Sequence, residues 1–447
     1  MTPLAWLVLV GVGSPAALFA ILAAASLIAP AAPPLRRPFT ARREQWTARI
    51  AGAFIAASFV ALSLAIAVNG SATRLLSYGD WSASREGGIA IEFLVDRLSL
   101  AFAALSAAIC GVVSAFSNRY LHRERGYNRY FVLLAMFVTG MLLVALAGNV
   151  AVLFIGWELV GLSSALLVGF FHERPAPVSN ALRVLSVYRI SDAAMLSAAV
   201  MLRSIAGTDS LALLFSGGIG AVSTVGLTET SATIIAVLLI VAVAGKSALL
   251  PFSGWLPRAM EGPTPSSAVY YGSLSIHAGC FLLLRSAPLL EHAAGARIFA
   301  GALGLATAIF AAIATRVQSD VKSSLAFAAL TQVGIIIVEI SLGWYTLAFI
   351  HIVGHACFRL LQFLSAPNVL HDLHGMEDAI GDRPHAPSWT ERLLSERVRR
   401  RVFLVALERG FLDSILDRVI VGPFTSIARR LSNIDRRLCN AVMPGDD

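Results

Sequence analysis

Apolar runs of about 20 residues recur along most of this chain, and no other feature restricts its possible folds as strongly. A helix of that length crosses the roughly 30 Å hydrocarbon layer of a bilayer. We therefore expect an all-α polytopic membrane protein. The sequence predicts eleven spans, at residues 4–30, 50–69, 96–118, 129–147, 149–171, 180–204, 231–252, 264–287, 297–315, 323–342 and 345–366.

The composition agrees with this class. Of 447 residues, 57% are hydrophobic and only 14% are charged, whereas a soluble domain is nearer a quarter charged. The net charge of +8 does not indicate nucleic-acid binding, because no basic module with interleaved aromatic residues is present. The four cysteines are scattered, without the spacing of a disulfide framework, a zinc site or an iron–sulfur site. We interpret residues 4–28 as a retained span rather than a signal peptide.

The arginine-rich loops predict the orientation. One follows the first span and one follows the third, and they contain Arg36, Arg37, Arg42, Arg43 and Arg49, and Arg119, Arg123, Arg125 and Arg129. Loop 205–230 is nearly free of positive charge, and its residues 209–226 read as an external loop. The positive-inside rule makes the arginine loops cytoplasmic. In a bacterial inner membrane, the N-terminus is then outside and the C-terminus is cytoplasmic.

The pattern changes after about residue 370. Residues 391–440 contain eleven arginines mixed with apolar residues at helical spacing. This pattern favours amphipathic helices on the cytoplasmic membrane face or against a partner protein. A solvated helical tail is the alternative.

Ionisable side chains interrupt several predicted spans. A charge at the centre of a bilayer costs from about 2.5 to more than 10 kcal/mol, so such residues are usually functional. They are Glu158 in the fifth span, Arg189 and Asp192 in the sixth, Lys246 in the seventh, and His351, His355 and Arg359 at four-residue steps in the eleventh.

Lys246 is one of only two lysines among 35 Lys and Arg residues. A buried lysine can release its proton, whereas an arginine stays charged in proteins. We therefore predict that Lys246 exchanges protons and that the protonation of Glu158 responds to it. In the structural alternative, Lys246 extends toward the cytoplasmic end of its span near Pro251, and Glu158 forms an ion pair with Arg189. Arg189 could also neutralise Asp192 at a spacing of three residues.

The histidines of the eleventh span suit proton relay, because imidazole gains and loses a proton near neutral pH. Arg359 on the same face can hold a charge in place but cannot relay a proton. Polar packing between helices is an alternative role. Zinc binding by His351 and His355 is another, but no carboxylate or cysteine has a suitable ligand spacing, so we expect no metal in this chain.

Helix interruptions also indicate transport. Four prolines, at positions 251, 257, 263 and 265, separate the seventh and eighth spans, and Asp320 and Lys322 stand at the entry to the tenth. Broken helices can line cavities in membrane proteins, although ordinary cytoplasmic loops would read similarly. No P-loop, dinucleotide fingerprint or nucleophile elbow is present, so we expect neither a cofactor nor catalytic residues in this chain, and not an enzyme.

These motifs resemble the antiporter-like, proton-translocating subunits of respiratory complex I (its L-type subunit) and of multisubunit cation/proton antiporters. The resemblance covers the third to the eleventh span, roughly 270 residues. It rests on "DRLSL", "FIGWELVGLSSALLVGFF", "YRISDA", "AGKSALLPFSGWLPRAMEGPTPSSA", "QSDVKSSLAFAALTQVG" and "HIVGHACFRLLQFL".

The resemblance implies roles for particular residues. Glu158 would pair with Lys246, Arg189 and Asp192 would modulate that pair, and His351 and His355 would match the histidines of a broken eleventh helix. The family has two inverted five-helix repeats, and its spans after the eleventh are missing here. The implied parts are N-terminal helices at 1–120, a complete first repeat at 121–290, a truncated second repeat at 291–370 and a cytoplasmic tail at 371–447. Arg359 replaces a lysine of the family.

The segments "CFRLLQFLSAPNVLHDLHGMEDAIG" and "LERGFLDSILDRVIVGPF" look like the membrane subunit of the DAB inorganic-carbon transporter family. That resemblance implies a large DabA-like partner on the cytoplasmic face, containing zinc as in a carbonic anhydrase and hydrating CO2 to bicarbonate. This chain would conduct protons, or Na⁺, to drive it. The alternative is a subunit of a complex I-like dehydrogenase or of a cation/proton antiporter. A third possibility is a membrane anchor whose buried charges only hold helices together.

Overall fold

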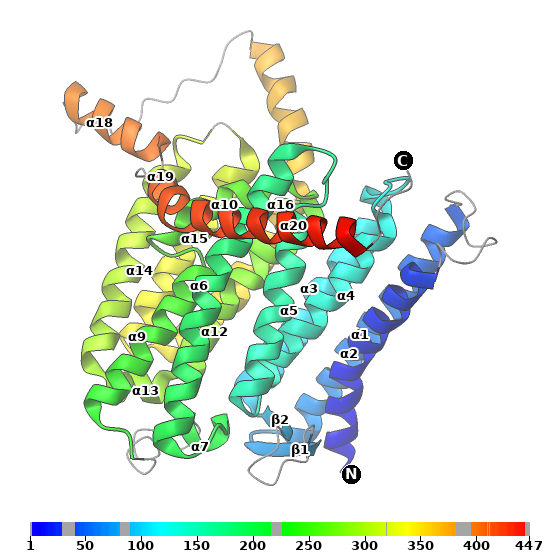
Figure 1. The fold of residues 1–447 in the computed structure, drawn as a ribbon, viewed down its shortest axis with the longest axis vertical. Helices are drawn as coiled ribbons and strands as arrows, with labels where there is room; N and C mark the ends of the chain where they lie inside the picture. Colours follow the sequence, from blue (N-terminus) through cyan, green and yellow to red (C-terminus); the bar gives the residue numbers. More distant parts are fainter. Residues whose placement is uncertain are drawn as a thin grey trace.

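The computed structural model describes residues 2–28, 41–80, 90–215, 226–318, 320–380, 395–408, 410 and 412–442. Within these ranges, eleven helices are long and apolar enough to cross a membrane, which confirms the predicted fold class and number of spans. The single-helix spans are α1 (Pro3–Ile28), α2 (Ala41–Asn69), α3 (Arg97–Tyr120), α4 (Tyr127–Leu146), α5 (Val150–Val168), α6 (Pro175–Ala206), α9 (Glu229–Lys246), α14 (Ala294–Thr315), α15 (Val321–Ser341) and α16 (Tyr345–Ile380). They form a bundle with α1 and α2 at one edge (Figure 1).

Side-chain caps begin several of these spans at the positions where the apolar runs start. Asp96 accepts a hydrogen bond from the backbone of Ser99 at 2.7 Å, and Asn149 accepts one from Val152 at 2.9 Å. Such a cap satisfies a helix N–H that has no partner within the helix and contributes about 1 kcal/mol.

Close helix contacts depend on two pairs of glycines. A Cβ added at Gly140 of α4 would lie 2.9 Å from the carbonyl oxygen of Gly156 in α5. One added at Gly304 of α14 would lie 2.7 Å from the carbonyl oxygen of Gly334 in α15. Small residues let helix backbones approach closely in membranes, where packing rather than the hydrophobic effect drives association. The same device therefore joins α4 to α5 and α14 to α15.

The segment between the seventh and eighth spans is broken, as the prolines predict. Helix α9 ends at Lys246, six residues before the predicted end, because Ala248 adopts a left-handed backbone with φ of 57° and Pro251 has no N–H for a helix. Short pieces follow: η2 (Phe252–Gly254), α10 (Trp255–Arg258) and η3 (Ala259–Glu261). The eighth span is itself divided into α11 (Thr264–Ser266), the π-helix η4 (Ser267–Ser273) and α12 (Ser275–Arg285).

Regular structure also occurs where none was predicted. Strands β1 (Arg74–Asp80) and β2 (Ala90–Val95) form an antiparallel pair, and helix α13 (Ala287–His292) follows α12. The stretch predicted as an external loop, 209–226, contains a short helix, α7 (Leu211–Phe215), so that prediction was incomplete. Leu211 and Leu214 of α7 are buried, and their packing stabilises this short helix.

Hydrogen bonds bring the described parts of the two arginine-rich loops together at one end of the bundle. Glu44 at the start of α2 contacts His122 Nδ1 at 2.6 Å and accepts a hydrogen bond from the backbone of Arg123 at 3.1 Å. The two strands and α7 lie at the opposite end (Figure 1). We call the arginine end the cytoplasmic end, as the charge pattern predicts.

Amphipathic helices form the tail, as predicted: α18 (Glu396–Leu407), α19 (Leu412–Leu416), the π-helix η6 (Asp417–Val421) and α20 (Gly422–Val442). An ion pair between Arg183 of α6 and Asp417 ties this tail to the bundle, and α20 runs across the spans (Figure 1). Helix α16 continues to Ile380, well past the predicted span end at residue 366.

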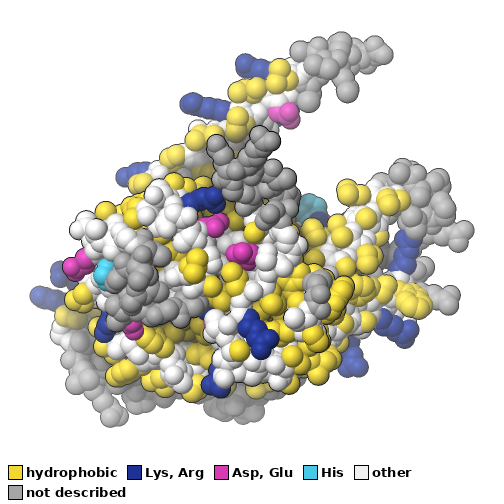
Figure 2. Space-filling model, turned by 90° about the horizontal axis from the view of Figure 1, so that it is seen from below, with side chains coloured by type: hydrophobic (Ala, Val, Ile, Leu, Met, Phe, Trp, Pro, Cys, Tyr) yellow, Lys and Arg dark blue, Asp and Glu magenta, His cyan; other side chains and the backbone are white. Residues whose placement is uncertain are grey.

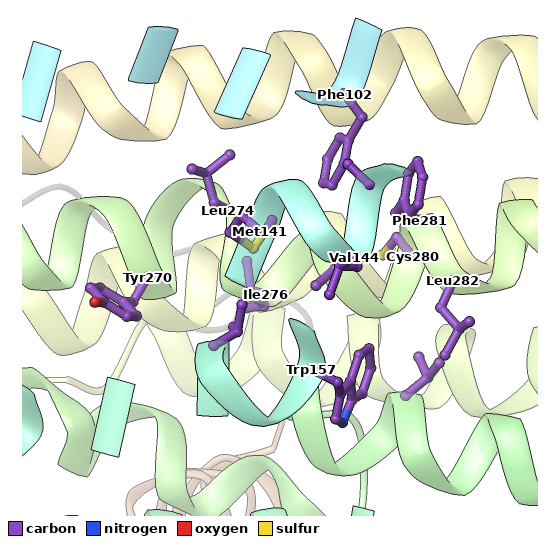
Figure 3. Packing of buried hydrophobic residues seen from close by; sticks show 14 of the residues in the cluster. Phe102, Met141, Val144, Trp157, Tyr270, Leu274, Ile276, Cys280, Phe281 and Leu282 are labelled. Atoms are coloured by element: carbon purple, nitrogen blue, oxygen red, sulfur yellow. The ribbon is translucent and has the colours of Figure 1, made fainter. Parts of the chain in front are cut away.

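Buried hydrophobic residues fill the centre of the bundle. Phe102 of α3 stacks on Phe281 of α12, with ring centroids 4.5 Å apart, and Trp157 lies in the same cluster (Figure 3). Figure 2 shows hydrophobic side chains over much of the surface seen from below, with Lys and Arg side chains in small separate groups. Large hydrophobic side chains are also exposed along the spans, among them Val200, Ile309 and Ile350, which suits a bilayer because lipid solvates apolar side chains on the outside of a bundle.

Candidate functional site

Lys246 lies completely buried at the C-terminal end of α9. Its ammonium donates a hydrogen bond to the carbonyl oxygen of Trp157 in α5 at 2.8 Å. The same nitrogen lies 5.0 Å from the centre of the Trp157 ring and 4.5 Å from that of Tyr188 in α6, within cation–π range. Lys246 therefore points into the bundle toward α5, and the alternative in which it extends toward the cytoplasmic end is wrong.

Gly161 makes the space that the lysine head occupies. A Cβ added at Gly161 would lie 2.8 Å from the Lys246 nitrogen. The "GWELVGLSS" stretch of α5 thus supplies the carbonyl that binds the lysine and, one turn later, the missing side chain that admits it.

Arg189 of α6 bridges the two carboxylates of this region. Its guanidinium nitrogen Nη2 lies 2.6 Å from Oε2 of Glu158 and 2.8 Å from Oδ2 of Asp192. Asp192 is buried, but neither of its oxygens has a well-aligned hydrogen bond, so its contact with Arg189 is electrostatic. The ion pairs of the structural alternative are therefore present in this state.

The implied pair of Glu158 with Lys246 is not in direct contact here. Among the described residues, no carboxylate lies within ion-pair distance of the lysine nitrogen, which instead binds the carbonyl of the residue before Glu158. Since Arg189 forms an ion pair with Glu158, a direct proton exchange between Glu158 and Lys246 needs a rearrangement of side chains. The switching role of this pair stays a prediction.

A second polar cluster joins α12 to α16 through two histidines. His277 Nε2 lies 2.9 Å from His355 Nδ1, and His277 Nδ1 lies 2.6 Å from the carbonyl oxygen of Ser273. Arg359 donates from Nε to His355 Nε2 at 3.0 Å. All four groups lie in contact in the order Arg359, His355, His277, Ser273.

Donor chemistry assigns both histidine tautomers. Arginine can only donate, so His355 Nε2 accepts and its proton is on Nδ1. His355 then donates to His277 Nε2, which leaves the His277 proton on Nδ1, facing the Ser273 carbonyl. Both imidazoles are neutral in this arrangement, and the hydrogen bonds all point from Arg359 toward the break in the eighth span.

His351 belongs to a separate branch on the other side of His355. Its Nδ1 lies 3.0 Å from Oε1 of Glu339 in α15, and its Nε2 lies 3.1 Å from Oε1 of Gln332. The His351 and His355 rings are 6.2 Å apart, too far for a direct hydrogen bond. A cavity of about 290 Å³ opens beside both histidines and Arg359.

Sequence reasoning missed three members of these clusters: His277, Gln332 and Glu339. The rule that identified Glu158, a carboxylate within an apolar run, also applies to Glu339 in "GIIIVEISLG". His277 gave a weaker signal, because a single neutral imidazole hardly changes the hydropathy of its span.

Ser247 connects the two clusters through the protein. It follows Lys246, and its hydroxyl donates at 2.7 Å to the carbonyl of Ile276, the residue before His277. Several buried hydroxyl groups in this part of the bundle have no hydrogen-bond partner within the described protein; they are those of Tyr188, Ser253, Ser267, Ser273 and Ser275.

Asp320 and Lys322 have local structural contacts. Asp320 caps α15 by accepting from the backbone of Ser323 at 2.8 Å. Lys322 donates to the carbonyl oxygens of Gly262 at 3.1 Å and Met260 at 3.4 Å, so it satisfies backbone groups that the broken segment leaves free.

Within the described ranges, no group of three or more His, Cys, Asp or Glu side chains is placed to hold a metal ion. Two further histidines, His371 and His374, follow the eleventh span, and their side chains lie outside the described part of the chain.

Comparison with known families gives two matches. Residues 147–382 match the family described as NADH:quinone oxidoreductase/Mrp antiporter, TM. Residues 81–131 match the family described as NADH-Ubiquinone oxidoreductase (complex I), chain 5 N-terminus.

Two curated relatives illustrate the similarity. NADH-ubiquinone oxidoreductase chain 5 of Halichoerus grypus is 33% identical over 304 residues, which cover 68% of this chain and 48% of that protein. NADH-quinone oxidoreductase subunit L of Mycobacterium tuberculosis is 33% identical over 296 residues, which cover 65% of this chain and 46% of that protein. The chain thus spans about half the length of the curated relatives it matches.

Among solved structures, the Mrp complex of Dietzia sp. DQ12-45-1b contains a chain that matches with a TM-score of 0.67 and 26% identity, over 90% of this chain and 43% of that one. A chain of the archaeal membrane-bound sulfane sulfur reductase matches with a TM-score of 0.62 over 78% of this chain and 70% of that one. At 18% identity, the second match shows a shared fold only.

Proposed function

The chain belongs to the NADH:quinone oxidoreductase/Mrp antiporter transmembrane family, and from this premise we propose that it conducts protons as one membrane subunit of a larger energy-coupled complex. The observation that supports the proposal most is the series of buried ionisable groups through the middle of the bundle. It includes Lys246, linked through Ser247 and Ile276 to the segment containing His277, and continues by direct contact to His355 and Arg359.

Lys246 is the exchanging group in this proposal. Of the cations in the first cluster, only the lysine can release its proton, because a guanidinium stays charged. When Lys246 is charged, it favours ionised Glu158 and Asp192 nearby; when it is neutral, those carboxylates gain a proton more readily. Arg189 holds both carboxylates in position and sets how strongly they respond.

Water completes the path between the two clusters. Buried hydroxyl groups are normally hydrogen-bonded, and ordered water supplies the partners that the protein lacks. The hydroxyls without protein partners include those of Ser267 and Ser273 in the π-helix η4 and Ser275 at the start of α12, two residues before His277. We assign the relay between Lys246 and His277 to water bound at this break.

Arg359 controls entry to the histidine relay. Its Nε–H occupies His355 Nε2, so an incoming proton reaches that nitrogen only after the guanidinium moves away. The added proton then allows His355 to pass its Nδ1 proton to His277, and His277 to release its own toward Ser273. The replacement of a lysine by arginine here gives the relay a gate that does not itself exchange protons.

The relatives favour a setting of the complex I or Mrp type, the second of the two expected from sequence. The partners would then be further membrane subunits, and any redox chemistry would belong to them. The inorganic-carbon setting, with a zinc-containing DabA-like partner and H⁺ or Na⁺ as the driving ion, has no support from these relatives. We therefore prefer the complex I or Mrp setting.

Purification of the tagged full chain from its own cells in mild detergent tests the setting, with mass spectrometry and zinc analysis of the proteins that co-purify. A set of redox or antiporter subunits is expected. One large zinc protein in near-equal amount would instead restore the inorganic-carbon proposal.

Proton movement by the purified complex in vesicles, followed with a pH-sensitive dye, tests the activity itself. Movement that is unchanged when Lys246 is replaced would reduce this chain to a membrane anchor.

A further inference from the structure

A hollow lies between α2 and α3, away from both polar clusters. It has a volume of about 800 Å³ and is open at its side. Its walls include Arg49 and Gly52 of α2 and Gly111, Ser114 and Arg119 of α3. We call it the α2/α3 groove.

The groove runs from the cytoplasmic end of the bundle into the membrane. Helix α2 begins at this end and α3 finishes there, so Arg119 lies at the end of α3, and Arg49 lies about two turns into α2, directly before its apolar run. Gly111 lies eight residues before Arg119, which corresponds to about 12 Å along a helix axis. The groove therefore has charge at its rim and small residues at depth, over the length of a lipid headgroup and the first part of its acyl chains.

The two arginines are available to an anion. Both are exposed, and neither forms an ion pair with a carboxylate among the described residues. The contact recorded for the Arg49 guanidinium is with the ring of Trp46, 6.0 Å away. An arginine on the cytoplasmic side attracts anionic lipid headgroups and binds phosphate in a bidentate manner.

Gly52 keeps the groove open. A Cβ added there would meet no atom within 4 Å, so its missing side chain leaves free space rather than permitting a tight helix contact. One added at Gly111 would only touch Ile55, at 3.7 Å. This differs from Gly140 and Gly156, where helix backbones fill the space.

We propose that the α2/α3 groove binds one anionic phospholipid, with its phosphate between Arg49 and Arg119 and its acyl chains along Gly52 and Gly111. The hollow is open, apolar in its depth and cationic at its rim, and it lies on a chain whose apolar outer surface faces lipid. A bound lipid would fill the seam between α2 and the rest of the bundle. It would also support Tyr120, whose hydroxyl lies 3.0 Å from that of Thr264 at the start of the broken eighth span.

The test uses the purified full chain, equilibrated with equal amounts of dioleoyl-phosphatidylglycerol and dioleoyl-phosphatidylcholine and then washed in detergent. Mass spectrometry of the intact protein counts the phospholipids that each chain retains. The wild type is expected to retain phosphatidylglycerol in preference. The preference should fall about fivefold for each of Arg49→Gln and Arg119→Gln, as one arginine near an anionic surface predicts.

Gly52→Leu tests the cavity separately from the charge, because a Cβ at this position meets no atom within 4 Å, so leucine projects into the groove, and leucine favours a helix more than glycine does. This variant is expected to lose both lipids while unfolding no more readily than the wild type. Arg97→Gln, at the other end of α3, and Gly13→Leu, at another glycine with open space, are the matched controls. Equal retention in the groove variants and the controls would overturn the proposal, as would the absence of any phospholipid preference in the wild type.

Discussion

Lys246 donates its hydrogen bond to the carbonyl oxygen of Trp157, 2.8 Å away, and not to the carboxylate of the next residue, Glu158. The lysine is thus held beside the glutamate by the backbone of α5 without neutralising it. Arg189 neutralises it instead, at 2.6 Å. Because Lys246 binds the carbonyl of Trp157 while Arg189 binds the carboxylate of the next residue, direct pairing of Glu158 with Lys246 needs a rearrangement of these side chains.

The first prediction concerns proton exchange at Lys246. Lys246→Arg keeps a cation but removes a group that can release its proton, so proton movement should fall by about a hundredfold or more, the range found for single proton-transferring groups. Lys246→Met should do the same. Dye-monitored proton movement in vesicles measures the loss, and co-purification of partner subunits shows whether assembly is retained.

Lys322→Arg is the control for that prediction, because Lys322 donates hydrogen bonds to two backbone carbonyls, which an arginine can also do. Its activity should stay near that of the wild type. Equal losses at Lys246 and Lys322 would argue that both positions serve structure, and full activity of Lys246→Arg would exclude exchange at this residue.

The second prediction tests the space at Gly161. Gly161→Ala places a Cβ 2.8 Å from the Lys246 nitrogen, so the ammonium must leave the Trp157 carbonyl or the helices must separate. Overpacking of this kind costs about 1–3 kcal/mol. Proton movement and the denaturant midpoint should both fall. Gly13→Ala, where an added Cβ meets no atom within 4 Å, should change neither proton movement nor the denaturant midpoint. Equal effects of Gly161→Ala and Gly13→Ala would show that the space at Gly161 is not needed for Lys246.

The spans were predictable because length and hydropathy alone identify a membrane helix, and α3 illustrates how closely. It was predicted at 96–118 and occupies 97–120, with Asp96 as its cap. Hydropathy did not predict the strands β1 and β2, because they lie outside the predicted spans and give no hydropathy signal. The early end of α9 was not predicted, because it depends on the left-handed backbone conformation of Ala248, which no side-chain pattern reveals.

Within the site, residue type identified ionisable groups that lie inside the bundle, but not how they contact one another. A charge in an apolar run identified Glu158, Asp192 and Lys246, but whether Arg189 or Lys246 contacts Glu158 depends on helix rotation and tilt, which hydropathy does not record. His277 was missed because its partner, His355, is 78 residues away and only packing of α12 against α16 joins them.

The third prediction concerns the gate at Arg359. Arg359→Lys replaces a permanent donor with one that can transfer its own proton to His355 Nε2. The relay should therefore open without movement of a guanidinium, and proton movement should rise and become more dependent on pH. A pH series of initial rates, wild type against variant, measures this.

His355→Gln, with Arg359 unchanged, is the control for Arg359→Lys. Glutamine keeps a hydrogen-bonding side chain but cannot relay a proton. It should abolish transport at every pH. An Arg359→Lys profile that overlays the wild type would show that Arg359 does not control entry to the relay.

The last prediction concerns the ion pair between Asp96, before α3, and Arg285, at the end of α12. Nη2 of Arg285 lies 3.1 Å from Oδ1 of Asp96, Nη1 contacts Oδ2, and both side chains are largely buried. Burial alone would raise the pKa of the Asp96 carboxyl, but the hydrogen bond and charge of Arg285, with hydrogen bonds from Ser99, hold it below its usual value. The pair therefore stabilises the bundle whenever Asp96 is ionised.

Because the folded pKa is the lower one, this stabilisation is complete above the unfolded value of about 3.9 and is lost as the pH falls through the folded value. Asp96→Asn keeps the helix cap, since asparagine caps as well as aspartate, but leaves Arg285 without its counter-ion, at a cost of about 3–5 kcal/mol near neutral pH. Denaturant midpoints from about pH 6 to about pH 3 should converge for wild type and variant as the pH falls. The double variant Asp96→Asn, Arg285→Met should recover part of the lost stability. If the difference in denaturant midpoint between wild type and Asp96→Asn does not narrow in acid, Asp96 does not stabilise the protein through its ion pair with Arg285.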